Sequence, residues 1–258
     1  MSRSQFRGEN AIRVKKLVKS FDGKEEVLKG IDLDIPRGKI TFIIGFSGTG
    51  KSVLLKHLLG VFKPSSGSVE VLGKDLAELS HDQTIEVRKN FGVLFQGAAL
   101  FDDQTVLENV RFPLDEHRRD LKKPERQELA ATRLKLVGIE EKHFHKLPGQ
   151  ISGGMQKRVG LARAIALNPE ILLYDEPTTG LDPILTEMVD NLIIETHKYQ
   201  EGVTSIIVSH DLTAAFRLAD YIAMLDSGKV LLFGTPQVFL DSDNKLVRKF
   251  VDKGIHRK

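Results

Sequence analysis

Apolar and polar residues alternate along the first part of the chain. Over 11–35 the apolar positions recur at every second residue, with a break at 22–24. A period of two predicts antiparallel strands joined by a turn. The wholly apolar run 40–44 predicts a short strand, and the leucine-rich stretch 51–59 predicts a helix that ends at Gly60.

The middle of the chain, 96–167, has the pattern of helices. Thr105 is followed three residues later by a glutamate, which predicts a capping box at a helix start. A second helix is expected to begin at Pro124 and to end at Gly138, and a third is expected over 152–168. This stretch therefore reads as a helical insertion.

Strands and helices alternate again from Glu170 onward. A helix is predicted over 184–199, and an Asp-Ser-Gly turn at 226–228 predicts a hairpin. Further strands are expected at 68–72, 92–95, 171–174, 203–208, 221–225 and 229–233. Such alternation predicts an α/β core with a parallel sheet.

The chain is expected to form a single α/β domain over 1–258. A core with a parallel sheet and an N-terminal antiparallel β part is assigned to 10–95 and 168–240, an inserted α-helical subdomain to 96–167, and a C-terminal tail to 241–258. The basic end 253–258 is expected to be solvated.

Composition narrows the possible functions. The chain has 258 residues, of which 41% are apolar and 28% charged, as in a globular protein. The net charge of +3 is too small to indicate a nucleic-acid surface, so no nucleic-acid partner is expected. The absence of cysteine excludes disulfides, cysteine zinc sites and thiol catalysis. No apolar stretch approaches the roughly 18 to 20 residues that cross a bilayer, and 1–8 lacks the apolar core of a secretory signal. We therefore expect a soluble protein whose membrane role, if it has one, needs a partner chain.

The segment GFSGTGKS, at 45–52, lies between the strand 40–44 and the helix 51–59. It satisfies the P-loop pattern in the strand–loop–helix context that the pattern requires. Glycines let backbone N–H groups converge on phosphate oxygens, and a helix N-terminus adds the positive end of a dipole. Lys51 would reach the β- and γ-phosphates, and the Ser52 hydroxyl would bind Mg²⁺. A flexible turn, the alternative, does not explain the Gly-Lys-Ser ending. The predicted nucleotide-binding residues are Gly45, Ser47, Gly48, Thr49, Gly50, Lys51, Ser52 and Val53.

Two acids and a histidine follow predicted strands. Asp175 and Glu176 come at the carboxyl end of the strand 171–174, where α/β sheets bind ligands. Asp175 would hold Mg²⁺ through its water shell, and Glu176 would orient and polarise the attacking water. The alternative for this pair is that the two acids simply begin a loop. His210 follows the strand 203–208, and the alternative to a catalytic role for it is a structural one.

These motifs, in their order along the chain, resemble those of the nucleotide-binding subunits of ABC transporters. The resemblance extends from Ile12 to about Phe250. Besides the P-loop, Asp175-Glu176 and His210 (the H-loop), the matching positions are Phe21, Gln96 of the Q-loop, the signature 151–155 and the D-loop 180–182.

The resemblance implies a homodimer with ATP and Mg²⁺ as cofactors. Two subunits would bind head to tail, so that Ser152, Gly153 and Gly154 of one contact the γ-phosphate held by the P-loop of the other. Phe21 would stack on adenine, and Gln96 would sense the metal and the γ-phosphate. His210 would steady that phosphate, and Asp182 is counted among the nucleotide-binding residues. The catalytic set is Glu176, His210, Gln96 and Lys51; the metal set is Ser52, Gln96 and Asp175.

The signature departs from the usual Leu-Ser-Gly-Gly-Gln of the family. Ile151 and Met155 replace its first and last members. Met155 cannot donate the hydrogen bonds of a glutamine amide, although Gln156 lies next to it.

Within the family, the chain is similar to the ATPases of Mla and Mce-associated lipid transport. The similarity lies in 92–101, 105–114, the Ser-Gly-Gly-Met signature and 180–184. It implies a MlaE-like membrane permease, an MCE lipid-binding protein and a small STAS-type regulatory subunit as partners. Phospholipid would move between the inner and outer membranes, with the ATPase at the cytoplasmic side of the inner membrane. The permease's coupling helix would dock on 96–114, where Phe101 and Phe112 are candidates for contact and Phe95 is expected to be core.

Three other functions use similar parts. A nucleotide-dependent kinase also has a P-loop, but needs neither the Ser-Gly-Gly helix nor a histidine after the next strand. A non-transport ABC ATPase usually carries two cassettes or a long coiled coil, whereas this chain has one cassette and no heptads. An ABC importer of polar amino acids or an ion is the nearest rival.

Overall fold

The computed structural model describes residues 9–255 of the chain. The chain divides into two compact units, which are described separately: a first unit of Met1–Arg88 with Gly202–Lys258, and a second unit of Lys89–Glu201. The prediction that 1–8 is not a secretory signal concerns residues outside the described range, and the predicted solvation of the basic end concerns side chains of 253–258 that are likewise not described.

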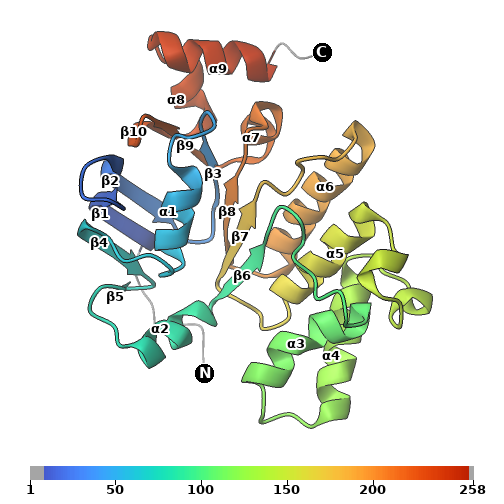
Figure 1. Cartoon of the computed structure of the whole chain (residues 1–258). Coiled ribbons are helices and arrows are strands. Elements are labelled where there is room, and N and C mark those ends of the chain that lie inside the picture. Colours follow the sequence, from blue (N-terminus) through green and yellow to red (C-terminus); the bar gives the residue numbers. More distant parts are fainter. Residues whose placement is uncertain (1–8, 256–258) are drawn as a thin grey trace. The chain divides into compact units, whose positions relative to one another are not determined.

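The first unit contains an antiparallel sheet with the strand order β2-β1-β4-β5 (Figure 1). Its strands are β1 (Asn10–Ser20), β2 (Glu26–Pro36), β4 (Ser66–Val71) and β5 (Lys74–Asp75). Val14 on β1 faces Leu33 on β2, and both side chains are buried. The predicted antiparallel β part is therefore confirmed, because period-two alternation places these residues on one buried face.

The first unit also contains parallel strands. β3 (Ile40–Ile44) pairs in parallel with β8 (Thr204–Val208) and with β9 (Tyr221–Asp226). β10 (Lys229–Gly234) pairs antiparallel with β9, as the Asp-Ser-Gly turn predicts. All five residues of β3 are buried, which is the pattern of a central parallel strand rather than an edge strand.

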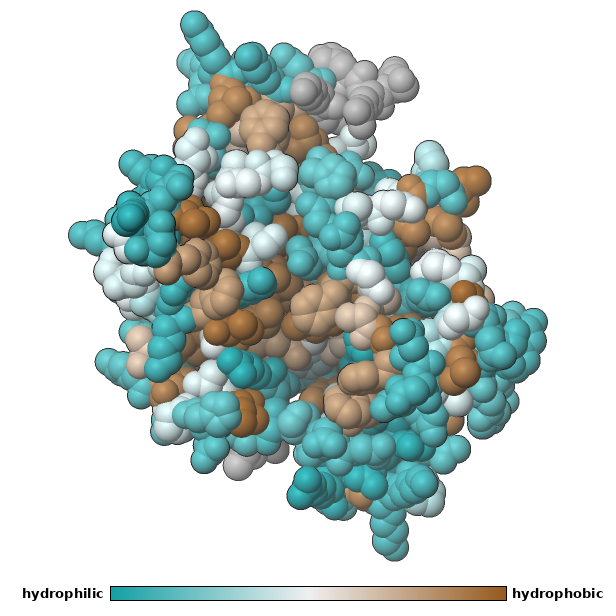
Figure 2. Space-filling model, viewed as in Figure 1, coloured by the Kyte–Doolittle hydropathy of each residue, from teal (hydrophilic) through white to brown (hydrophobic). Residues whose placement is uncertain are grey.

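The described part of this unit contains five helices: α1 (Lys51–Leu58), α2 (His81–Arg88), α7 (Leu212–Leu218), α8 (Pro236–Leu240) and α9 (Lys245–Ile255). α1 was predicted, and Gly60 after it is left-handed with a φ of 64°. The sequence did not indicate the other four. α9 lies in the predicted tail, where it buries Val247, Phe250 and Val251. Its outer side is hydrophilic, with apolar residues beneath it (Figure 2).

The second unit combines a strand pair with helices (Figure 1). β6 (Phe91–Leu94) runs parallel to β7 (Ile171–Asp175). The helices are α3 (Val106–His117), α4 (Lys123–Leu136), α5 (Gly153–Ala164) and α6 (Pro183–Tyr199), with short 3-10 turns at Glu141–His143 and Pro148–Gln150. The assignment of 96–167 as a helical subdomain stays a prediction; α3, α4 and α5 lie within that range.

Two local predictions in the second unit have different outcomes. The capping box before α3 is confirmed, because the Glu108 N–H donates to Thr105 Oγ1 at 3.2 Å and the Thr105 N–H donates to Glu108 Oε2 at 2.9 Å. The predicted end of α5 is wrong: the helix ends at Ala164, before the expected 168. The chain tightens there into three-residue turns and reaches a left-handed Asn168 with a φ of 52° before Pro169.

Across 9–255, no helix is both long enough and apolar enough to cross a membrane.

Candidate functional site

The P-loop connects β3 to α1, as predicted. Gly45, Gly48 and Gly50 have φ values of 152°, 80° and 100°, a region that favours glycine. A Cβ at Gly45 would overlap the carbonyl oxygen of Leu225, and one at Gly50 would lie 2.7 Å from Leu28 Cδ2. Conformation and close approach thus both require glycine at the two ends of the loop.

Lys51 folds back over this loop. Its Nζ donates to the carbonyl oxygen of Gly45 at 2.7 Å and to that of Phe46 at 3.0 Å. Thr49 Oγ1 donates to the same Phe46 oxygen at 2.9 Å. The first turn of α1 contains no acidic residue, so a mobile cation and the positive end of the helix dipole lie at one place. This arrangement fits the phosphates of a nucleotide.

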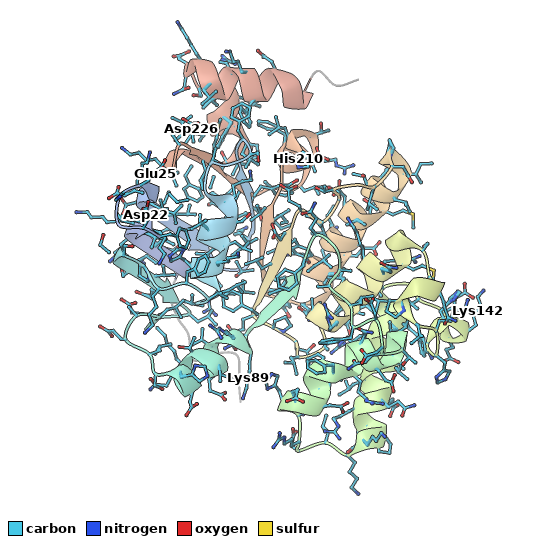
Figure 3. All side chains as sticks on the ribbon, viewed as in Figure 1. Asp22, Glu25, Lys89, Lys142, His210 and Asp226 are labelled. Carbon is cyan, nitrogen blue, oxygen red and sulfur yellow. The ribbon has the colours of Figure 1, made fainter. Side chains whose placement is uncertain are left out.

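His210 lies at the same sheet edge as the P-loop. β3 and β8 are parallel, with Ile43 opposite Val208, so their carboxyl ends coincide. The Ser209 N–H donates to Ile43 O at 3.2 Å, which ties the two strand ends together. His210 follows directly and is labelled between β8 and α7 in Figure 3. The structure therefore brings His210 to the edge from which the P-loop leaves the sheet.

Phe21 lies in the turn between β1 and β2 and is 59% exposed. Asp22 shapes this turn: its Oδ1 accepts from the Lys24 and Glu25 N–H groups at 2.9 and 3.0 Å, and these bonds lower the pKa of the Asp22 carboxyl (Figure 3). The Phe21 ring packs edge-on against that of Phe62, 5.3 Å between centroids. An exposed ring on a braced turn is suited to stacking on a base.

The second unit carries two of the predicted metal residues and the predicted water-handling acid at one edge of its strand pair. Leu94 on β6 faces Tyr174 on β7, so the two parallel strands end side by side. Gln96 follows β6 and is exposed, while Asp175 ends β7 and Glu176 comes next. Parallel pairing thus brings together three residues that are far apart in the sequence.

Glu176 has an unusual backbone. Its φ is 49°, in the left-handed region that non-glycine residues rarely adopt. Thr179 Oγ1 donates to Glu176 Oε2 at 3.0 Å, so the carboxylate is held by its own loop. Strained backbone of this kind concentrates at functional sites.

Ser152 begins the signature helix as predicted. It is the N-cap of α5, and its Oγ accepts from the Met155 N–H at 3.3 Å. Ser152 and Gly153 are exposed, whereas Gly154 is buried, with space for a Cβ limited by Leu185 Cδ2 at 3.2 Å. No acidic side chain lies in the first turn. The helix start can therefore accept an anion.

The residues around the signature clarify two further predictions. Gln156 donates through Nε2 to Pro148 O at 2.9 Å, so it braces the preceding turn rather than replacing the missing glutamine at Met155. Asp182 is the N-cap of α6, accepting from the Leu185 N–H at 2.9 Å, and is exposed.

Lys157 was not among the site residues predicted from the sequence. It lies on α5 and is 8% exposed, with its Nζ bonded to backbone carbonyls of the loop after β7. The available signal was a lysine on the helix face that also carries Leu161 and Ala164.

The donor set fits Mg²⁺ that is bound together with a nucleotide. Among residues 9–255, no group of three or more His, Cys, Asp or Glu side chains could hold a metal ion alone. Mg²⁺ commonly takes one or two protein oxygens, substrate phosphates and water. Ser52 in the first unit, and Gln96 and Asp175 in the second, each carry an oxygen of the kind that Mg²⁺ takes in this way.

Comparison with known proteins identifies the family. A family model described as ABC transporter matches residues 28–179. Over 244 residues, the chain is 43% identical to the probable ribonucleotide transport ATP-binding protein mkl of Mycobacterium leprae (strain TN), covering 94% of this chain and 69% of that protein. It is 38% identical to the methionine import ATP-binding protein MetN 1 of Oceanobacillus iheyensis, covering 93% and 71%. The dimeric structure of MJ0796, a bacterial ABC transporter cassette, matches with a TM-score of 0.79 and 34% identity, covering 87% of this chain and 98% of that one.

The chain therefore belongs to the ABC transporter family, as the motifs predict. It has the α/β P-loop fold of the ATP-binding cassette, with an antiparallel β part and a helical insert. It is an ATP hydrolase coupled to transport that uses ATP and Mg²⁺. The matching cassette MJ0796 has also been solved as a dimer in a post-hydrolysis state with ADP and Pi. The chain spans about two thirds of the length of its mkl relatives.

Proposed function

We propose that this chain powers phospholipid transport between the inner and outer membranes in a Mla-type system that maintains outer-membrane lipid asymmetry. Its partners are a second copy of itself, a MlaE-like permease and, through the permease, an MCE lipid-binding protein, with a STAS-type subunit as regulator. It works at the cytoplasmic side of the inner membrane, held there by the permease. The relatives' names give different cargoes, so the cargo is inferred from the segments, 92–101 and 105–114 among them, that resemble the lipid-transport ATPases.

The observation that carries this proposal is an apolar groove of about 320 Å³ in the second unit. Both segments that resemble the lipid-transport ATPases, 92–101 and 105–114, contribute to it. Phe95, Phe101 and Phe112 line the groove and are 42%, 39% and 38% exposed. The expectation that Phe95 is core is therefore wrong: β6 ends at Leu94, and Phe95 in the loop that follows is exposed.

Ring contacts and hydrogen bonds connect the residues of one wall of the groove. The rings of Phe101 and Phe112 lie 4.8 Å apart between centroids, and the guanidinium of Arg163 lies 5.8 Å from the Phe101 centroid. Arg163 donates to the carbonyl oxygens of Ala98 and Ala99 at 2.7 and 2.8 Å, which holds the loop under the aromatic pair. Exposed aromatic side chains on such a support are typical binding anchors for an amphipathic helix.

The proposal assigns each site residue a role in hydrolysis. Lys51 and the P-loop amides bind the phosphates, and Phe21 stacks on the base. Ser52, Gln96 and Asp175 hold Mg²⁺, which supplies charge neutralisation at the phosphates. Glu176 accepts the proton of the attacking water, and His210 holds the γ-phosphate. Ser152, Gly153, Gly154 and Asp182 complete the site of the neighbouring subunit. The arrangement is supported by the two sheet edges and the N-capped α5 described above.

Removing the groove aromatics should detach the chain from its permease. The double replacement Phe101→Ala and Phe112→Ala is expected to lower recovery of the membrane permease on a tagged chain by at least about tenfold, because both rings are anchors. Tyr199→Ala, which removes an aromatic that is 55% exposed on α6, is the matched control and should leave recovery unchanged.

Mass spectrometry of the native complex should find phospholipid. Absence of bound lipid, together with stimulation of ATP hydrolysis by methionine or another polar amino acid, would instead identify the chain as the ATPase of an amino-acid importer.

The composite site can be tested by cross-linking, since the chain has no cysteine. Ser47 and Ser152 are both exposed. Subunits carrying Ser47→Cys alone, mixed with subunits carrying Ser152→Cys alone, should form a disulfide-linked dimer when ATP is bound. Mixing Ser47→Cys with Ser66→Cys subunits is the control, because Ser66 lies on β4 and has no place in the proposed interface. A chain carrying both Ser47→Cys and Ser152→Cys that closes a disulfide only within itself would contradict the head-to-tail dimer.

A further inference from the structure

Lys157 is a buried cation in the second unit. Its side chain lies on the inner face of α5 with 8% of the residue exposed, and burial lowers the pKa of its ammonium. Its Nζ donates to Pro177 O at 2.6 Å and to Thr179 O at 3.1 Å. A buried ammonium is tolerated where its N–H groups are bonded. Lys157 therefore joins α5 to one loop, the one that follows β7.

Both acceptors follow Glu176 in the same loop. Pro177 is the next residue, and Thr179 donates from Oγ1 to Glu176 Oε2 at 3.0 Å and from its N–H to Glu176 O at 3.3 Å. Thr179 thus has two separate bonds: its carbonyl accepts from the Lys157 ammonium, and its hydroxyl donates to the Glu176 carboxylate. Thr179 therefore lies between Lys157 and the carboxylate.

The backbone of Glu176 needs such support. A non-glycine residue with a φ of 49° relaxes unless its surroundings hold it. Pro177 restricts the chain on one side because its ring sets its own φ. The bond from Lys157 to the Pro177 carbonyl then holds the peptide that follows the proline. Together these contacts keep Glu176 in the left-handed conformation.

We propose that Lys157 is a positioning residue for Glu176, acting through Pro177 and Thr179. This inference rests on the proposed role of Glu176 in polarising water. Lys157 also lies on the helix that Ser152 begins, so α5 links the residues offered to the neighbouring subunit's phosphate with the carboxylate of its own subunit. A displacement of the helix start moves the donor that holds the Glu176 loop.

The test compares two variants of the purified full chain. Lys157→Met keeps the length of the side chain and removes all its donors; Thr179→Val keeps the shape and removes the hydroxyl bonded to Glu176. Each is expected to lower kcat for ATP between about tenfold and a hundredfold, because small misplacements of a catalytic group have effects of this size. KM and the equilibrium affinity for MgATP should stay within about twofold, because neither side chain contacts the nucleotide in the proposed site.

The double variant shows whether both residues act on one group. If they act through the Glu176 loop, Lys157→Met with Thr179→Val should lose little more kcat than the worse single variant, since neighbouring effects on one group are not additive. Arg158→Met is the matched control: Arg158 lies next on α5 and donates to Gly138 O at 3.0 Å, away from this loop. Its kcat should remain within about twofold of wild type.

Three outcomes would overturn the inference. They are a wild-type kcat in Lys157→Met, a fully multiplicative loss in the double variant, and a loss confined to KM. Thermal unfolding of each variant separates poor folding from poor positioning, and Thr179→Val keeps the test decisive if Lys157→Met does not fold. Glu176→Gln separates the proposed role of Glu176 from the positioning role of Lys157. If Glu176→Gln loses turnover while Lys157→Met does not, only the positioning role of Lys157 is wrong.

Discussion

Replacing Glu176 by Gln is expected to lower ATP turnover by about 10²- to 10⁴-fold while MgATP binding stays nearly unchanged, because removal of a general base has effects of this size. The amide has the shape of the carboxylate and keeps an oxygen that accepts from Thr179 Oγ1, a bond of 3.0 Å in the structure. It cannot, however, take up a proton from water. Steady-state phosphate release and equilibrium ATP binding measure the two parts separately.

The same variant should accumulate as an ATP-bound dimer, detectable as a shift in size-exclusion chromatography. Glu187→Gln is the matched control, because Glu187 is an exposed acid on α6 of the same unit. It should keep wild-type turnover. Hydrolysis by Glu176→Gln near the wild-type rate would show that another group polarises the water, and the role assigned to this residue would be wrong.

Replacing Lys51 by Ala is expected to abolish hydrolysis and to weaken MgATP binding by about ten- to a hundredfold, the effect of losing hydrogen bonds from a charged group. The Nζ lies within the loop, bonded to Gly45 O and Phe46 O at 2.7 and 3.0 Å. Alanine therefore removes both the charge for the phosphates and a clamp on the loop. The backbone amides that remain carry only partial charges. Calorimetry with Mg²⁺ present measures the affinity.

Lys56→Ala is the control for Lys51. Lys56 is exposed on the same helix, and its Nζ lies 5.2 Å from the Phe62 centroid rather than in the loop. Its loss should leave both affinity and turnover close to wild type. Unchanged ATP affinity in Lys51→Ala would contradict the interpretation of the loop as a phosphate cradle.

Features encoded by neighbouring residues were predictable. The P-loop places glycines where Gly45 and Gly50 adopt positive φ, and the Thr105–Glu108 capping box closes within four residues. The hairpin at 226–228 likewise depends on a two-strand pattern around one turn. In each case the physical cause acts over a few residues, so a local pattern carries enough information.

The grouping of site residues was partly predictable. A parallel sheet aligns strand ends, so residues after β3 and β8, or after β6 and β7, share an edge in their unit. Strand assignment places each of these residues at the carboxyl end of a strand, but the pairing of β3 with β8 and of β6 with β7, which brings His210 to the P-loop and Gln96 to Asp175, is seen only in the structure. The catalytic roles assigned to these residues remain predictions.

By itself, the sequence determined the phosphate loop and most strands of the two units, because backbone preferences and hydrophobic periodicity act locally, and its ordered motifs indicated the class of protein. The tertiary structure decided which distant groups meet. In the sequence, Lys157 looks like an ordinary helix lysine. In the structure, the loop that begins twenty residues later packs against α5, and backbone carbonyls of that loop accept from the Lys157 ammonium. Phe95 was expected to be core, but β6 ends before it and its ring is exposed. The segment of α9 was expected to be a tail, but the helix buries Val247 and Phe250. Burial and hydrogen-bond partners depend on the approach of segments far apart in the chain, which no local pattern records.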